Sequence, residues 1–297
     1  MKIAMIGAGN VGASAAFLLL SHKIAKELVL LDINANLAKG KALDLAQSAT
    51  LLDINAKIQG GDDYKMLKNA DICVLTAGFA RKDGQSRDEL ASKNASIVSL
   101  WASKIAKFAP KSVIIVVTNP LDVMVSVALK FSGFEKERVL GMAGELDSAR
   151  LKYEIATHFG LKNSDVSAQM FGEHGQNMFA LNASVRGRKI SKNELLHLEN
   201  QAKIGGAKFI ALLGTSAFYA PSAGIFKMCK ALKSKNGLEL ICSIGDENGV
   251  ACAQILKFGK KIKIINAKLN AIKAKKYAQA YAAIKQNLLN LENLSHK

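Results

Sequence analysis

The sequence predicts an α/β protein in which a doubly wound parallel sheet is followed by a smaller α+β domain. In the first half, apolar and β-branched runs alternate with helical patterns, as in parallel β-α-β units. A glycine-rich turn joins the first of these strands to the first helix, and the regular alternation stops near residue 144. We therefore expect two domains, residues 1–143 and residues 144–297.

Each expected element is a run of apolar residues with the period of a strand or a helix. In the first domain we expect strands at 2–6, 28–33, 56–59, 71–76 and 112–117. Helices are expected there near 10–21, 36–50, 87–108 and 120–131. In the second domain we expect helices near 146–159, 193–213, 218–234 and 270–293 and strands near 166–171, 179–186 and 239–245.

The turn after the first strand has the pattern of a dinucleotide site, G-x-G-x-x-G. Gly7 permits the tight turn, Gly9 lets the backbone approach a pyrophosphate, and Gly12 lets the helix pack on the strand. Asp32 ends the second strand about twenty residues later, where its carboxylate would accept hydrogen bonds from ribose hydroxyls. This order of elements predicts a Rossmann-type domain that binds NAD rather than NADP.

Composition argues against several other classes of protein. The 297 residues are 49% hydrophobic with a mean hydropathy of +0.12, which fills a large core and argues against disorder. No apolar run is long enough to span a membrane, and three glycines and Asn10 interrupt the stretch that a signal peptide would need. The four cysteines form no C-x-x-C pair, which favours a reduced, cytoplasmic setting.

The net charge of +17 raises the question of a nucleic-acid or anionic-membrane partner. The lysines are scattered, however, with only modest clustering between Lys257 and Lys276 and without interleaved aromatic residues. We therefore expect neither partner and interpret these lysines as a solvated helix face. A positive surface would also steer a dianionic substrate towards its site.

Two polar segments follow strands of the first domain. Thr76-Ala77-Gly78 leads into a loop that carries Arg81 and Arg87, which suits either a lid that closes on an anion or a solvated surface loop. Asn119 follows the last strand of this domain, where its amide would either meet a ligand or cap the next helix. We expect Pro120 in the first turn of that helix.

A third polar segment contains a histidine. His174 lies in G-E-H-G at a strand end, where it would serve either as a general acid–base group near neutral pH or as a surface loop residue. Asp147 and Arg150 are three residues apart and therefore share one helix face, which by itself describes an ordinary ion pair.

Together these motifs resemble the lactate/malate dehydrogenase family, most closely its lactate-dehydrogenase-like malate dehydrogenases. The resemblance covers nearly the whole chain, through GAGNVG, LLDI, GKALDL, TAGFARKDGQSR, VVTNPLD, GMAGELDSAR, GEHG and SAFYAPS. It implies reversible NAD-dependent oxidation of (S)-malate to oxaloacetate, a step of the tricarboxylic acid cycle, by a cytoplasmic homodimer or homotetramer without a metal. Ala80 and Asp83 depart from prolines, and Gln176-Asn177 from an Asp-Ser pair, that are common in the family.

The resemblance also implies a role for each polar residue. His174 would give and take the proton of the substrate oxygen, and Asp147 would hold its imidazole. Arg150 would bind the C1 carboxylate in a bidentate fork, while Arg87 would polarise the reacting carbonyl. The residues assigned to the cofactor are Gly7, Gly9, Asn10, Val11, Gly12, Asp32, Thr76, Ala77, Gly78, Asn94, Val117 and Asn119, of which Asn119 would also position the substrate.

Arg81 carries the choice of substrate. Malate enzymes of the family have Arg at the matching lid position, and lactate enzymes have Gln. A guanidinium enclosed by a lid needs a counter-charge, which oxaloacetate supplies and the methyl group of pyruvate does not. The alternatives are an L-lactate or other 2-hydroxy acid dehydrogenase and, from another class, a non-catalytic NAD sensor, which would need only the glycines and Asp32.

Overall fold

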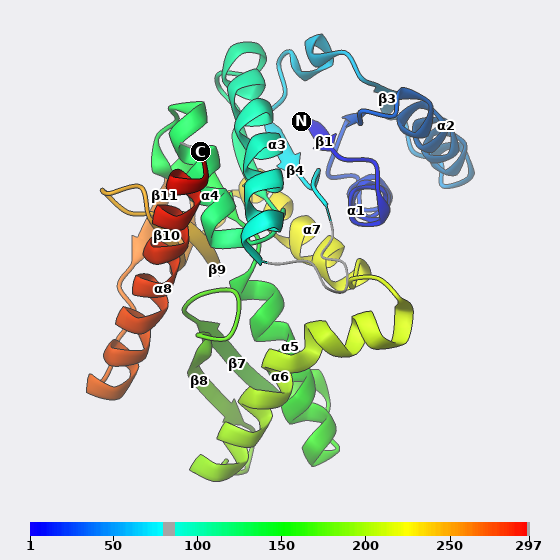
Figure 1. The fold of residues 1–297 in the computed structure, drawn as a ribbon. Helices are drawn as coiled ribbons and strands as arrows, with labels where there is room; N and C mark the ends of the chain where they lie inside the picture. Colours follow the sequence, from blue (N-terminus) through cyan, green and yellow to red (C-terminus); the bar gives the residue numbers. More distant parts are fainter. Residues whose placement is uncertain (80–86, 296–297) are drawn as a thin grey trace.

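A computed structural model describes residues 1–79 and 87–295, apart from the side chains of residues 87, 88, 207, 294 and 295 (Figure 1). The strands are β1 (Lys2–Ile6), β2 (Glu27–Leu31), β3 (Lys57–Gly61), β4 (Ile72–Leu75), β5 (Val113–Val116), β6 (Val139–Gly141), β7 (Val166–Phe171), β8 (Phe179–Val185), β9 (Leu238–Gly245), β10 (Ala251–Phe258) and β11 (Ile262–Ile265). The α-helices are α1 (Asn10–Ser21), α2 (Ala35–Leu51), α3 (Arg87–Phe108), α4 (Leu121–Ser132), α5 (Gly144–Phe159), α6 (Lys192–Leu213), α7 (Tyr219–Ser234) and α8 (Ala271–Ser295). Short 3-10 turns are η1 (Tyr64–Leu67), η2 (Lys136–Arg138) and η3 (Asn163–Asp165).

The described residues form a nine-stranded sheet in the order β11-β10-β9-β6-β5-β4-β1-β2-β3. Strands β1 to β6 pair in parallel, whereas β9, β10 and β11 continue the sheet from β6 in antiparallel pairs. The strand order reverses between β1 and β4, which creates a switch point where ligands bind beyond the carboxyl ends of the strands. The predicted α/β fold with a doubly wound sheet is confirmed.

The alternation of side chains along the central strands explains why helices cover both faces of the sheet. Ile3 and Met5 of β1 pack in the core beneath α1, α2 and α7, whereas Ala4 and Ile6 pack in the core beneath α3, α4 and α8. All four residues are fully buried. Because successive side chains of a strand point to opposite faces, a strand covered on both sides is a continuous apolar run.

A smaller antiparallel sheet of β7 and β8 packs with α5 and α6 around a core of its own, in the lower part of Figure 1. Phe171, Phe179 and Leu181 of this hairpin also pack against Ile241 of β9 and Ala253 of β10. Since β9 to β11 lie in the large sheet, the second half of the chain contributes to both sheets. The division at residues 143 and 144 stays a prediction.

The structure adds elements that the sequence pattern did not suggest. Strand β6 has three residues and ends in a glycine, and β10 and β11 mix apolar residues with Ala, Gln and Lys, so the period of a strand is weak in all three. Helix α4 begins at Leu121, so the expected place of Pro120 in its first turn is wrong by one residue, and the bond between Asn119 and Pro120 is cis. None of the helices formed by the described residues is long and apolar enough to cross a membrane.

Candidate active site

A cavity of about 660 Å³ opens at the carboxyl ends of the central parallel strands. One end is lined by residues that follow β1, β4 and β5, namely 9–12, 76, 78–79 and 117–120. The other end is lined by Arg150 of α5, by residues 173–176 after β7 and by residues 215–218 between α6 and α7. Asn287 and Leu291 of α8 also contribute to the lining, as do residues 90, 91, 142, 146, 206, 210 and 221.

At Gly7 and Gly12 the glycine turn is shaped by contacts that leave no room for a side chain. Gly7 has a φ of +104°, and a Cβ at Gly12 would lie 1.9 Å from the carbonyl oxygen of Gly7. At Gly9, by contrast, a Cβ would have no heavy atom within 4 Å. Gly9 lines the cavity, so its main chain faces the space that a pyrophosphate would enter.

Asp32 lies beside this turn, at the end of β2. Its carboxylate accepts the main-chain N–H of Ala8 at 2.8 Å and that of Asn34 at 3.0 Å. These bonds hold the carboxylate in place next to the loop. The tight glycines, the open backbone at Gly9 and the fixed carboxylate together fit the requirements of an NAD site.

The other predicted cofactor residues divide into two groups. The first group lines the cavity together with Gly9 and Gly12 and consists of Asn10, Val11, Thr76, Gly78, Val117 and Asn119. The second group is not part of the lining that the described residues form and consists of Gly7, Asp32, Ala77 and Asn94. Asn94 is fully buried and donates to the carbonyl oxygens of Phe79 and Asn119, the latter at 2.7 Å. It therefore braces the two cavity segments from behind. The residue before α4 is Pro120, so the alternative in which Asn119 caps that helix is wrong.

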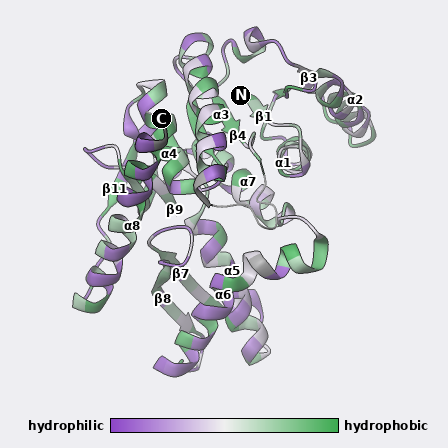
Figure 2. Ribbon diagram, viewed as in Figure 1, coloured by the Kyte–Doolittle hydropathy of each residue, from purple (hydrophilic) through white to green (hydrophobic). Residues whose placement is uncertain are grey.

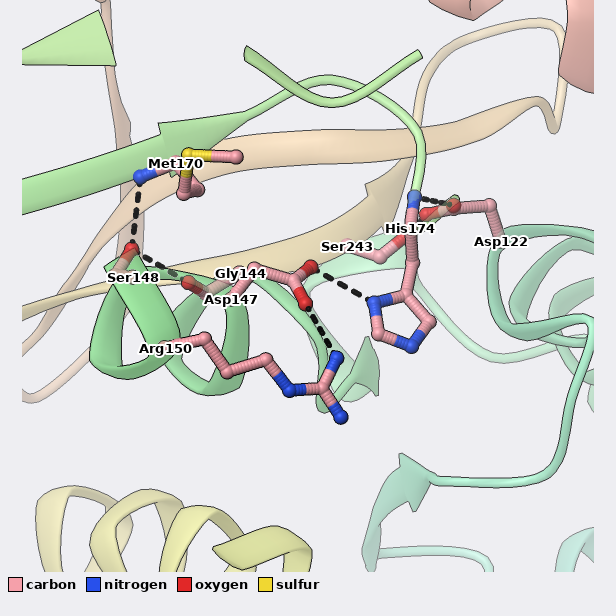
Figure 3. A network of polar contacts seen from close by, with 8 residues as sticks. All are labelled: Asp122, Gly144, Asp147, Ser148, Arg150, Met170, His174 and Ser243. Carbon is pink, nitrogen blue, oxygen red and sulfur yellow. Dashed lines mark hydrogen bonds and ion pairs between the residues drawn. The ribbon is translucent and has the colours of Figure 1, made fainter. Parts of the chain in front are cut away.

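The structure brings His174, Asp147 and Arg150 together at the other end of the cavity (Figure 3). The Asp147 carboxylate contacts His174 Nδ1 at 2.7 Å through one oxygen and Arg150 Nη1 at 3.3 Å through the other. The side chain of Asp147 is 4% exposed, against 17% for His174 and 18% for Arg150. The Asp147–Arg150 pair expected from spacing is thus part of a larger arrangement that includes the histidine.

This arrangement fixes the tautomer of His174. Because the carboxylate of Asp147 only accepts hydrogen bonds, Nδ1 carries the proton, and Nε2 is the atom that exchanges a proton with a ligand. Burial opposes the charged ring, but the charge and the hydrogen bond of Asp147 outweigh it and raise the pKa of His174 above its usual value. A histidine in this setting suits general acid–base chemistry near neutral pH.

Two further contacts place the residues of this end. Ser148 donates to the carbonyl of Gly144 at 2.6 Å and accepts the N–H of Met170 at 2.9 Å, which ties the first turn of α5 to β7 (Figure 3). Asp147 lies in that first turn, where the helix dipole favours a negative charge. Arg150 has a buried Nε without a hydrogen-bond partner among the described residues, as expected where an anionic ligand binds.

Several predicted residues lie outside what the structure describes. Arg81, Ala80 and Asp83 fall outside the described residues, and so does the side chain of Arg87, whose backbone begins α3. Gln176 lines the cavity beside His174, and the Asn177 amide donates to Glu173.

The sequence analysis assigned no role to Asp122 or Ser243, which are both buried. Asp122 contacts the main chain of His174, and Ser243 contacts Asp122. Asp122 is the last residue of the motif VVTNPLD, and its place in that motif was the sequence signal that could have identified it. Ser243 had none, because it reaches this place only through the pairing of β9 with β6.

Two family models match the chain: the NAD-binding domain of lactate/malate dehydrogenase over residues 1–141, and the α/β C-terminal domain of lactate/malate dehydrogenase over residues 144–292. The chain belongs to the lactate/malate dehydrogenase family. It is an NAD-dependent oxidoreductase, as the sequence predicted, and its cofactor is NAD.

Named relatives include both branches of the family. A Campylobacter jejuni protein named "Probable malate dehydrogenase" is 41% identical over 256 residues, which cover 84% of this chain and 85% of that protein. The structure of Plasmodium falciparum malate dehydrogenase has a TM-score of 0.94 at 31% identity and covers 99% of both chains. A Cryptosporidium parvum lactate dehydrogenase, complexed with lactic acid and β-nicotinamide adenine dinucleotide, has a TM-score of 0.92 at 31% identity over 98% of both chains.

Proposed function

We propose that this family member is a malate dehydrogenase, which interconverts (S)-malate and oxaloacetate with NAD. The observation that carries the proposal is the group formed by His174, Asp147 and Arg150 in the wall of a cavity whose other end fits NAD. It joins a proton-exchanging ring, a carboxylate that stabilises the charged ring, and a guanidinium for a substrate carboxylate. A sensor that only binds NAD has no need of this second end.

In the direction of malate oxidation, Nε2 of His174 takes the proton of the substrate hydroxyl. Asp147 stabilises the imidazolium that forms, and the raised pKa of His174 reflects this stabilisation. The guanidinium of Arg150 pairs with the C1 carboxylate and so orients C2 towards the nicotinamide side of the cavity. When bound, NAD supplies the acceptor for the hydride that leaves C2.

The choice between malate and lactate rests on Arg81 in the sequence, because the similarity of the fold extends to both kinds of enzyme. Arg81 would pair with the second carboxylate of malate or oxaloacetate, and Arg87 would polarise the reacting carbonyl. The decisive assay is NADH oxidation with oxaloacetate compared with pyruvate at equal ionic strength. A preference for pyruvate would replace this proposal with lactate dehydrogenase.

Arg81→Gln tests the residue that carries the choice of substrate. The change removes one charge and keeps a polar side chain. We therefore expect the transition state for oxaloacetate to lose roughly 1.5–3 kcal/mol of stabilisation, which lowers kcat/KM for this substrate. Pyruvate should be unaffected or improved, because no unpaired guanidinium remains. The readout is the ratio of the two efficiencies, measured by NADH oxidation.

Arg186→Gln is the matched control for that variant. Arg186 has a side chain that is 85% exposed, and it does not line the cavity, so its loss changes the net charge by the same amount. The control should leave the ratio unchanged. If Arg81→Gln also leaves it unchanged, Arg81 does not read the second carboxylate.

We also propose a homodimer or homotetramer in the cytoplasm. Exposed apolar side chains gather at the carboxyl end of α6, which Figure 2 shows in green; they include Phe209, Leu212 and Leu213. Helix α2 also exposes Leu43 and Leu51. The four cysteines are buried free thiols, which supports a reducing compartment. The proposed reaction, the interconversion of malate and oxaloacetate, is a step of the tricarboxylic acid cycle. Light scattering on the purified protein tests the oligomer, and a monomer at micromolar concentration would contradict it.

A further inference from the structure

Asp122 is a buried carboxylate that contacts the main chain of His174. It lies in the first turn of α4 with 4% of its surface exposed. Its Oδ2 accepts the main-chain N–H of His174 at 2.7 Å, and its Oδ1 accepts the hydroxyl of Ser243 at 2.6 Å (Figure 3). Asp122 therefore connects three parts of the chain at one point: α4, β9 and the segment that follows β7.

A buried carboxylate is a costly way to hold a loop. Burial disfavours its charge, and despite the bonds from Ser243 and His174 it raises the pKa of Asp122 to about 6. An asparagine would accept and donate at the same two places without that cost. The position therefore raises the question of what the negative charge contributes.

We infer that Asp122 is a positioning residue for His174: it holds the histidine by its main-chain nitrogen and adds a second negative charge to the surroundings of the ring. The inference deepens the proposed function and rests on it for its kinetic readout. His174 is then held at two points by two carboxylates: Asp147 at ring Nδ1 and Asp122 at the main-chain nitrogen. The bond to Asp147 constrains the ring, and the bond to Asp122 constrains the main chain that carries it.

The charges around the pair determine the expected direction. Asp147 and Asp122 favour the charged ring of His174, and Arg150 opposes it. The groups that act on Asp122 are His174, Ser243 and Glu173, and its charge in turn acts on Cys252 and Tyr277. Removing the charge of Asp122 while keeping its shape should therefore lower the pKa of His174.

Asp122→Asn and Asp122→Ala separate charge from anchoring. In Asp122→Asn the amide oxygen still accepts from His174 and the amide nitrogen donates to the Ser243 oxygen, so the ring should titrate at lower pH with kcat largely kept. In Asp122→Ala the anchor is lost, and kcat should fall on the order of tenfold to a hundredfold with the affinity for NADH unchanged.

Ser126→Ala is a matched control on the same helix. Ser126 is also a buried residue of α4, and it accepts the main-chain N–H of Ala251 at 2.9 Å without touching the His174 segment. This variant should lose thermal stability as Asp122→Ala does, yet keep kcat and the titration of His174. Stability and positioning are thereby distinguished.

The titration is measured by NMR on the ring of His174, one of five histidines, identified by its absence from His174→Asn. This readout needs no substrate, so a protein inactive on oxaloacetate would remove the proposed function and leave the positioning test intact. If Asp122→Ala does not fold, Ser243→Ala takes its place, with a smaller loss of kcat expected. Unchanged titration of His174 in Asp122→Asn overturns the inference. A loss of kcat in Asp122→Ala, or in its substitute Ser243→Ala, that is no greater than in Ser126→Ala overturns it as well.

Discussion

The two ends of the cavity are built from different parts of the chain. At the cofactor end, the residues that matter are glycines, whose lack of a side chain lets main-chain segments approach one another and a ligand. At the substrate end they are charged side chains, each held by another charge. The first end depends on shape and the second on electrostatics, so substitutions at the two ends should fail in different ways.

The difference also appears in how each end is braced. Asn94 and Thr76 hold the cofactor end through bonds to main-chain carbonyls, which fix loops without adding charge. Asp147 and Asp122 hold the substrate end with carboxylates, which fix His174 and also shift its proton equilibrium. The bracing carboxylates of the substrate end thus also take part in its proton chemistry, whereas Asn94 and Thr76 only brace.

The largest effect should come from the substrate end. His174→Asn removes the proton-exchanging ring and leaves the glycine turn untouched, so kcat should fall by about 10²–10⁴ while NADH binds as before. His158→Asn, on an exposed position of α5, is the control. The measurements are steady-state kinetics and NADH fluorescence, and most of the activity remaining would assign the proton to another group.

The cofactor end should respond to added volume rather than to lost charge. Gly12→Ala places a methyl group 1.9 Å from the Gly7 carbonyl oxygen, so the backbone must move and the melting temperature should drop, with a cost of about 1–3 kcal/mol. Gly9→Ala meets open space and should fold normally but bind NADH more weakly. Thermal melts and NADH titrations on both variants test this contrast. Equal melting temperatures of Gly12→Ala and Gly9→Ala would contradict it.

Much of this contrast could be predicted from the sequence. The glycine turn and Asp32 follow one another over a short stretch, so local spacing was enough to place them together. Asp147 and Arg150 share a helix face for the same reason. The approach of His174 to Asp147 was implied by family resemblance alone, because the two belong to different elements and no spacing rule joins them.

What was missed depends on long-range pairing. Asp122 and Ser243 meet only because β9 joins the sheet antiparallel to β6, and β6 is too short to be recognised as a strand. Strands β10 and β11 were missed because their charged and small residues hide the alternation. A sequence pattern identifies elements better than it identifies which elements become neighbours.

The pH dependence should show the electrostatic character of the substrate end. Oxaloacetate reduction needs the protonated ring of His174, and malate oxidation needs the neutral ring. Reduction should therefore weaken, and oxidation strengthen, as the pH rises through a midpoint above the usual value of about 6.5. Asp147→Asn should move the midpoint of kcat/KM to lower pH, and a midpoint that stays in place would assign the titration to another group.

The smallest expected effect concerns the charge of Asp32 at the cofactor end. The Asp32 carboxylate would face the 2′-phosphate of NADP, so Asp32→Ser should narrow the preference for NAD by roughly 1 kcal/mol, or about fivefold. Asp32 also accepts the N–H groups of Ala8 and Asn34, so the serine variant should lose some stability for reasons unrelated to repulsion. Asp32→Asn keeps the shape of the side chain and removes its charge, so it separates the effect of repulsion from the effect of losing the bonds to Ala8 and Asn34. The measured quantity is the ratio of kcat/KM for NAD and NADP. A ratio unchanged in both variants, or equal efficiencies in the unmodified protein, would show that the carboxylate does not select the cofactor.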